Sequence, residues 1–224
     1  MTLRRLLLPL LALTLLVAAC EPTTATAISA QGLQRQSDGW HGVPLEVERE
    51  MPDVTLLDTD GNEVNLREAT AGTPTLLFFG YTSCPDICPV HLAVLAGGMR
   101  ETRTTTEQVQ VVFVSVDPER DTPARIDEYL ASFDSRFLGL HAELPVVEDA
   151  LRQLDLPGPV VEGPDPRGEG DLIGHPAQIV GFDADGEARR VWPFGARRSD
   201  WVFDLPRIVE QWSAAQDEAA EDAA

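Results

Sequence analysis

Apolar residues are grouped along the chain in short blocks that predict buried β-strands. Residues 75–80 (TLLFFG) and 109–116 (VQVVFVSV) are largely apolar runs, which are typical of strands covered on both faces of a sheet. The sequences at 60–62 (DGN) and 183–186 (DADG) each lie between two shorter apolar runs, so each predicts a turn that joins two strands. The further predicted strands are residues 54–57, 63–66, 178–182 and 188–192.

Helical patterns fill much of the chain between these strands. Thr122 followed by Pro123 is typical of a helix N-cap with proline at the first helical position, and Ser199 or Asp200 is predicted to cap the last helix. The order of strands and helices predicts an α/β fold, a mixed central sheet with flanking helices and an N-terminal β-hairpin. The predicted helices are residues 87–102, 122–133, 148–154 and 199–214.

The first 20 residues have the pattern of a processing signal. Arg4 and Arg5 precede an apolar stretch over 6–19, which is shorter than the about 20 residues that a membrane-spanning helix needs. The stretch ends in Val-Ala-Ala-Cys, which resembles the cleavage box of bacterial lipoproteins. The resemblance implies that residues 1–19 are removed, that Cys20 is lipidated, and that the protein is exported and anchored on the outer face of a bacterial membrane. Ordinary secretion, with Cys20 merely near the cleavage point, is the alternative.

Composition divides the rest of the chain into three parts. Residues 20–42 are rich in Thr, Ala, Gln and Gly without periodicity, and predict a flexible tether from Cys20. Residues 43–214 hold all the predicted strands and helices, and form one domain. Residues 215–224 are predicted to be a disordered acidic tail.

The charge of the chain excludes several classes of partner. The 224 residues include 37 acidic residues and 17 Arg but no Lys, for a net charge of −20. Removal of residues 1–19 leaves 15 Arg against the 37 acidic residues, a net charge of −22. Nucleic acid and anionic membrane surfaces repel such a chain, so membrane attachment has to be covalent, whereas basic or metal-laden partners are favoured.

Cys84 and Cys88 carry the most informative chemistry. They lie where the first buried strand gives way to a helix, in the sequence FFGYTSCPDICP at 78–89. If Asp86 caps the helix, both sulfurs face its positive end, which favours thiolates. Such a pair can exchange disulfides or bind a soft ion such as Cu(I) or Zn²⁺. A purely structural disulfide is disfavoured, because so short a loop adds little stability.

A metal would need further ligands, and the chain has four His. His91 follows Cys88 by three residues, so the two could share a helix face, although a solvated helix residue is the plainer interpretation. His175 ends a stretch with four Pro and five Gly over 157–174, which predicts a mobile arm that brings a ligand to the sheet edge. A surface-loop histidine is the alternative there. His41 and His141 have no neighbours that suggest a site.

The residues around the cysteines resemble the SCO/SenC family of copper-delivery proteins. The similarity includes FFGYTSCPDICP at 78–89, VSVDPERDTP at 114–123 and His175 eleven residues before Gly186, and it covers about residues 43–212. It implies a thioredoxin-like fold and a copper ion, Cu(I) or Cu(II), held by Cys84, Cys88 and His175. His91 lies outside the family pattern. Pro176 departs from it, because the family more often has a small hydroxyl residue after the histidine.

The resemblance implies a function in assembly of the copper A centre of cytochrome c oxidase. The predicted function is a membrane-anchored metallochaperone that delivers copper to that centre or prepares it. Its partners would be the copper-bearing oxidase subunit, another copper carrier or a thiol reductant, with no nucleic acid. The alternative is a thiol–disulfide oxidoreductase in which Cys84 attacks and Cys88 resolves, although three residues separate them rather than the usual two. The turn 117–121 either joins strand to helix or docks a partner.

Overall fold

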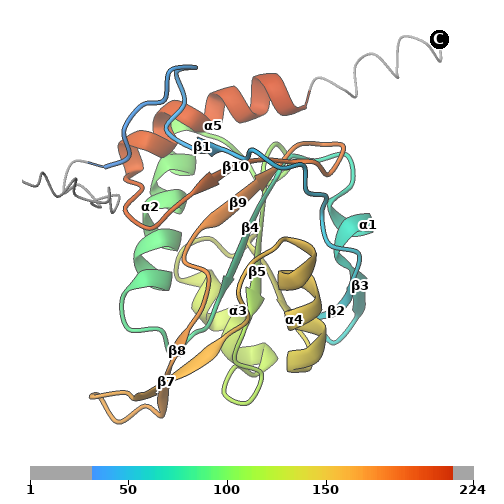
Figure 1. The fold of residues 1–224 in the computed structure, drawn as a ribbon, viewed down its shortest axis with the longest axis vertical. Coiled ribbons are helices and arrows are strands. Elements are labelled where there is room, and N and C mark those ends of the chain that lie inside the picture. The colour runs from blue at the N-terminus through green and yellow to red at the C-terminus, as the bar shows by residue number, and fades with distance from the viewer. Residues whose placement is uncertain (1–31, 214–224) are drawn as a thin grey trace, which may run out of the picture.

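The computed structural model describes residues 32–213, which fold around one large mixed β-sheet (Figure 1). The predicted signal peptide, Cys20 and the predicted tail lie outside the described residues. The strands are β1 (Val43–Pro44), β2 (Thr55–Asp58), β3 (Glu63–Asn65), β4 (Thr75–Gly80), β5 (Gln110–Ser115), β6 (Leu138–His141), β7 (Val160–Pro164), β8 (Asp171–Gly174), β9 (Ile179–Phe182) and β10 (Ala188–Trp192). The helices are α1 (Leu66–Thr70), α2 (Ile87–Thr102), α3 (Pro123–Ala131), α4 (Leu144–Gln153) and α5 (Arg198–Trp212).

The central sheet has the strand order β1-β10-β9-β4-β5-β6-β2-β3. β4, β5 and β6 run parallel, whereas β9 pairs antiparallel with β4. Every residue of β4 is buried, as its continuous apolar sequence predicts. The predicted α/β fold with a mixed sheet, flanking helices and an N-terminal hairpin, β2–β3, is confirmed.

Two capped helices begin at one edge of this sheet. The Asp86 carboxylate accepts the Ile87 N–H at the start of α2, and the Thr122 hydroxyl accepts the Arg125 N–H at the start of α3. Because α2 follows β4 and α3 follows β5, and these strands are parallel neighbours, both strand-to-helix turns lie at the same sheet edge. This is the edge where open α/β sheets place ligands.

Several elements differ from the prediction or were not predicted. α4 begins at Leu144, four residues earlier than expected, and β6 occupies an apolar run too short to show a period. Gly139 in β6 has no room for a side chain, since a Cβ there would lie 2.5 Å from Ile126 Cγ2 of α3. The arm expected at 157–174 is a hairpin of β7 and β8, paired only with each other among the described strands.

Residues 32–42, expected to belong to the tether, pack against α5. The Trp40 ring stacks on Trp212 with 5.6 Å between centroids. The N–H groups of His41 and Gly42 donate to the buried Asp204 carboxylate at 3.1 and 2.9 Å. One aromatic anchor and these backbone donors hold the segment, although its composition is that of a linker. No helix within residues 32–213 is long and apolar enough to cross a membrane.

Candidate metal centre

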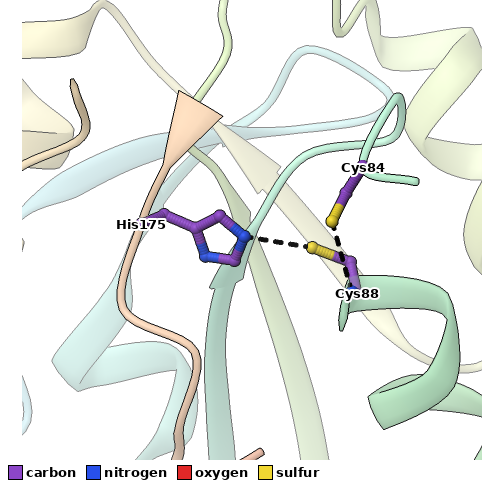
Figure 2. A group of neighbouring side chains, drawn as sticks. All are labelled: Cys84, Cys88 and His175. Carbon is purple, nitrogen blue, oxygen red and sulfur yellow. Dashed lines mark hydrogen bonds between the residues drawn. The ribbon is translucent and has the colours of Figure 1, made fainter. Parts of the chain in front are cut away.

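The turn from β4 to α2 brings the two cysteine side chains together. The Cys84 N–H donates to the Tyr81 carbonyl at 3.2 Å, which folds the loop back over the start of α2. Cys88 lies in the first turn of α2, and its N–H donates to Cys84 Sγ at 3.4 Å (Figure 2). The sulfur of Cys84 therefore lies at the positive end of the helix, where a thiolate is favoured.

Cys88 is the interior member of the pair. It is fully buried, whereas Cys84 is 7% exposed. A Cβ on Gly80 would lie 2.9 Å from Cys88 Sγ and 2.8 Å from the Phe113 ring. The absence of a side chain at the end of β4 thus makes room for the Cys88 sulfur.

His175 reaches the cysteines from the segment between β8 and β9. Its Nε2 lies 3.4 Å from Cys88 Sγ (Figure 2). Its Nδ1 lies 3.0 Å from the Pro176 carbonyl. A carbonyl can only accept, so Nδ1 carries the proton and Nε2 presents a lone pair to the sulfurs. Pro176 therefore does not keep the imidazole away, and its carbonyl selects the tautomer that binds a metal.

Aromatic rings fix the orientation of the imidazole. The Tyr81 ring meets the His175 ring edge-on with 5.6 Å between centroids, and the Phe78 ring does so at 6.1 Å. Both aromatic residues belong to β4 or to the loop that follows it. The elements that hold the cysteines therefore also orient the histidine.

The three side chains form a candidate metal centre. Cys84 Sγ, Cys88 Sγ and one His175 nitrogen all lie within 4.8 Å of one another, and no other such group was found within the described residues. Cys84 and Cys88 are not joined by a disulfide. Two soft sulfurs with one imidazole are the ligands that Cu(I) prefers, and the imidazole also suits Cu(II). The arrangement fits a copper ion.

The two thiols differ in acidity. The hydrogen bond from the Cys88 thiol, supported by the N–H groups of Cys88 and Asp86, lowers the pKa of Cys84 to about 4, against the opposing effect of burial. Burial raises the pKa of Cys88, and the neighbouring Cys84 sulfur raises it further. At neutral pH the pair is therefore one thiolate, Cys84, next to one thiol. Cys88 loses its proton when a metal ion binds.

A cleft of about 340 Å³ opens onto this group. Cys84, His175 and Ile173 of β8 are among the residues that line it. Asp86 and Glu162 place two acidic side chains along it. A metal ion or a partner's side chain could reach the sulfurs through the cleft.

Sequence reasoning missed the group that holds the cysteine loop in place. The carboxylate of Asp121 accepts the Thr82 N–H at 3.0 Å and the Ser115 hydroxyl at 2.6 Å. Thr82 precedes Cys84 by two residues, and Asp121 is only 2% exposed. Asp121 belongs to the motif at 114–123, but its contact with Thr82 depends on the pairing of β4 with β5.

His91 was expected as a possible ligand or as a solvated helix residue, and the second interpretation is wrong. Its ring is fully buried between Phe78 and Phe194, with 5.5 Å between centroids on each side. Neither ring nitrogen has a hydrogen-bond partner among the described residues. His91 is not part of the group of three ligands, and the same is true of His41 and His141.

Comparison with known proteins decides the family. The SCO1/SenC family model matches residues 44–210. The chain belongs to the SCO1/SenC family. A Stutzerimonas stutzeri protein whose name describes copper binding is 32% identical, over 75% of this chain and 78% of its own. This agrees with the family resemblance of the two motifs.

Solved structures of Sco proteins share this fold. Bradyrhizobium japonicum ScoI with copper bound is 30% identical, with a TM-score of 0.59 over 75% of this chain and 98% of its own. Yeast Sco1 with copper bound is 25% identical, with a TM-score of 0.63 over 80% and 93% of the two chains. The thioredoxin-like fold expected from the resemblance is confirmed.

Proposed function

We propose that this protein is a copper carrier that holds its ion between Cys84, Cys88 and His175. The observation that carries the proposal is the convergence of two buried sulfurs and an imidazole nitrogen within 4.8 Å. The similar ScoI and Sco1 structures with copper bound support copper as the ion. The buried thiolate of Cys84 supplies the first ligand, because it is already deprotonated at neutral pH.

The acceptor that we propose is the copper A centre of cytochrome c oxidase. The Sco family is described as one of cytochrome c oxidase assembly proteins. Three ligands leave the ion coordinatively open, so an acceptor thiolate that enters the cleft can replace one ligand at a time. The chain's charge of −20 favours an acceptor surface that is basic or already carries metal ions.

A second candidate function is reduction of the acceptor's cysteines, and the difference in acidity between the two thiols favours it. The Cys84 thiolate would attack the acceptor disulfide and release one acceptor thiolate. Cys88 would then lose its proton and attack Cys84 Sγ, which releases the second acceptor thiolate and leaves a Cys84–Cys88 disulfide. Two electrons pass to the acceptor, so each cycle requires an external thiol reductant.

One comparison separates the two functions. The reduced full chain carrying Cys20→Ser is mixed with one equivalent of copper and then with a peptide containing the two acceptor cysteines, either reduced or as a disulfide. A carrier passes copper to the reduced peptide and leaves its own thiols reduced. A reductase converts the disulfide peptide without metal and becomes oxidised. If the chain binds neither Cu(I) nor Cu(II), the proposed function is contradicted.

We also propose that Cys20 is lipidated and anchors the protein on the outer face of a bacterial membrane. The Val-Ala-Ala-Cys sequence after the apolar stretch supports this proposal. Cell fractionation of the full chain and of Cys20→Ser tests it. The unchanged chain is expected with the membranes and Cys20→Ser in the soluble fraction, and an identical distribution of the two would contradict the anchor.

A further inference from the structure

The hairpin that precedes His175 has little core of its own. β7 and β8 form a two-stranded sheet apart from the central one, and they project from one end of the molecule (Figure 1). Val160 and Val161 in β7 are 64% and 70% exposed, and Ile173 in β8 is only partly buried. An isolated two-stranded hairpin is marginally stable in water. The position of His175 therefore depends on contacts between the hairpin and the main domain.

Arg120 makes such a contact at the turn of the hairpin. Its Nη1 donates to the Glu169 carbonyl and its Nη2 to the Asp171 carbonyl, both at 2.8 Å. Gly170 lies between them with a φ of 95°, and a Cβ there would lie 2.7 Å from Arg120 Nη1. The guanidinium thus lies directly against the hairpin backbone, which requires glycine at this position.

Arg120 is held in this orientation by the main domain. Its Nε donates to the carboxylate of Asp117, which is 5% exposed. A buried carboxylate needs such a partner, because burial without one is costly. The guanidinium also lies 5.5 Å from the centre of the Tyr81 ring, whose hydroxyl accepts the Ile173 N–H of β8 at 3.2 Å.

The same turn also holds the cysteine loop. Asp121, the residue after Arg120, accepts the Thr82 N–H next to the cysteine sequence. The turn 117–121 therefore contacts both segments that carry ligands, the cysteine loop through Asp121 and the histidine hairpin through Arg120. The turn thus joins β5 to α3, as one of the two sequence-based alternatives predicts, and it also contacts the protein's own hairpin.

We propose that Arg120 is a positioning residue that latches the hairpin and so sets how long His175 stays over the sulfurs. The inference rests on the proposed copper-carrier function. When Arg120 releases the two carbonyls, the hairpin moves and His175 Nε2 leaves the ion, which Cys84 and Cys88 still hold. The ion then has an open position for an acceptor ligand. No covalent bond changes, and no electron is transferred.

The first test measures release of Cu(II) from the full chain carrying Cys20→Ser, so that Cys84 and Cys88 are the remaining thiols. Arg120→Met removes the latch donors, and Gly170→Ala displaces the guanidinium without changing Arg120. The two hydrogen bonds stabilise the docked hairpin enough that their loss should make both variants release Cu(II) to EDTA about tenfold faster. The affinity for Cu(I) should change less than about threefold. Arg136→Met, which breaks an exposed ion pair with Asp134, is the matched control. Unchanged release of Cu(II) in both Arg120→Met and Gly170→Ala would overturn the latch.

A double-variant comparison excludes a merely structural effect. In a chain that already carries His175→Ala, Arg120→Met should not accelerate release further, because the latch acts through His175. An equal acceleration with and without His175 would overturn the proposal.

Hydrogen exchange in the metal-free protein separates the latch from the copper function. Arg120→Met should reduce protection of the Ile173 amide at least fivefold and leave the β4 amides unchanged. This result supports the latch even if the unaltered chain binds no copper, an outcome that would reject the proposed function instead. Equal protection at Ile173 in both proteins would reject the latch whether or not copper binds.

Discussion

Single residues in the metal centre have distinct tasks that follow from their surroundings. Cys84 lies at the cleft with its sulfur at the helix start, which makes it the thiolate that first meets a ligand. Cys88 lies beneath it against Gly80 and keeps its proton. His175 supplies a neutral nitrogen whose lone pair is directed by the Pro176 carbonyl. The tasks of Cys84 and His175 thus depend on backbone contacts, with the Cys88 N–H and the Pro176 carbonyl, whereas that of Cys88 depends on burial.

His175 should matter more for Cu(II) than for Cu(I). Cu(I) is soft and is held well by two sulfurs, whereas Cu(II) gains more from an imidazole. In His175→Ala we expect Cu(II) affinity to fall about 100-fold, or about 2.7 kcal/mol, and Cu(I) affinity to fall less than tenfold. Competition with chelators of known affinity for each oxidation state measures this. His141→Ala, outside the centre, is the control, and equal losses for both ions would contradict the assignment.

His91 should make the protein sensitive to mild acid. Burial lowers the pKa of His91 from 6.5 to about 4. Between these values the unfolded chain binds a proton that the folded chain does not, so stability is lost as the pH falls from about 6.5 to 4. The loss from this residue is about 3 kcal/mol.

Urea unfolding of the metal-free chain at several pH values measures this effect. His91→Leu should flatten the fall in unfolding free energy between pH 6.5 and 4, whereas His141→Leu should not. If the unfolding free energies of His91→Leu and of the unaltered chain fall in parallel with pH, His91 does not cause the loss of stability in mild acid.

At the scale of elements, local signals explain why some parts were predicted and others were not. The bounds of β4 and α2 match the prediction because an uninterrupted apolar run meets a capped helix. The short run of β6 shows no comparable signal, and α4 begins without a side-chain cap, although Pro145 lies in its first turn. The β7–β8 hairpin was expected only as an arm, since its Pro and Gly content masks strands that exist through contacts with Arg120 and Tyr81.

The segment over residues 32–42 should stabilise the fold without affecting the metal centre. The fully buried Asp204 carboxylate accepts the Gly42 N–H and the Trp192 indole N–H, each at 2.9 Å. Asp204→Ala would leave these donors unsatisfied and should lower unfolding free energy by about 3 kcal/mol.

Chemical denaturation and copper titration test this together. The partly exposed pair of Asp38 with Arg190 is the control, and Asp38→Ala should cost less than about 1 kcal/mol. Copper affinity should be unchanged in both variants, because β1 and α5 lie at the opposite end of the molecule from β7 and β8 (Figure 1). An Asp204→Ala variant that is as stable as the unaltered chain, or one whose copper affinity changes, would contradict the prediction that this segment stabilises the fold without affecting the metal centre.

At the scale of the whole molecule, the metal centre depends on contacts between distant parts of the chain. Cys88 and His175 are 87 positions apart, and the antiparallel pairing of β9 with β4 brings them together. Local pattern identifies the cysteine pair, because spacing and helix start lie in one segment. It leaves His175 undecided between a ligand on an arm and a surface-loop histidine, because only the sheet topology or the family resemblance relates it to that pair.

The central claim is that copper is bound by two sulfurs and one imidazole from these three residues. X-ray absorption at the copper edge, measured on the full chain carrying Cys20→Ser and loaded with one equivalent of Cu(II), tests it most directly. The claim predicts two sulfur ligands and one imidazole. The sulfur ligands should be lost in the double variant Cys84→Ser, Cys88→Ser, and the imidazole should be lost in His175→Ala. A spectrum with only oxygen and nitrogen ligands, or an imidazole that persists in His175→Ala, would contradict it.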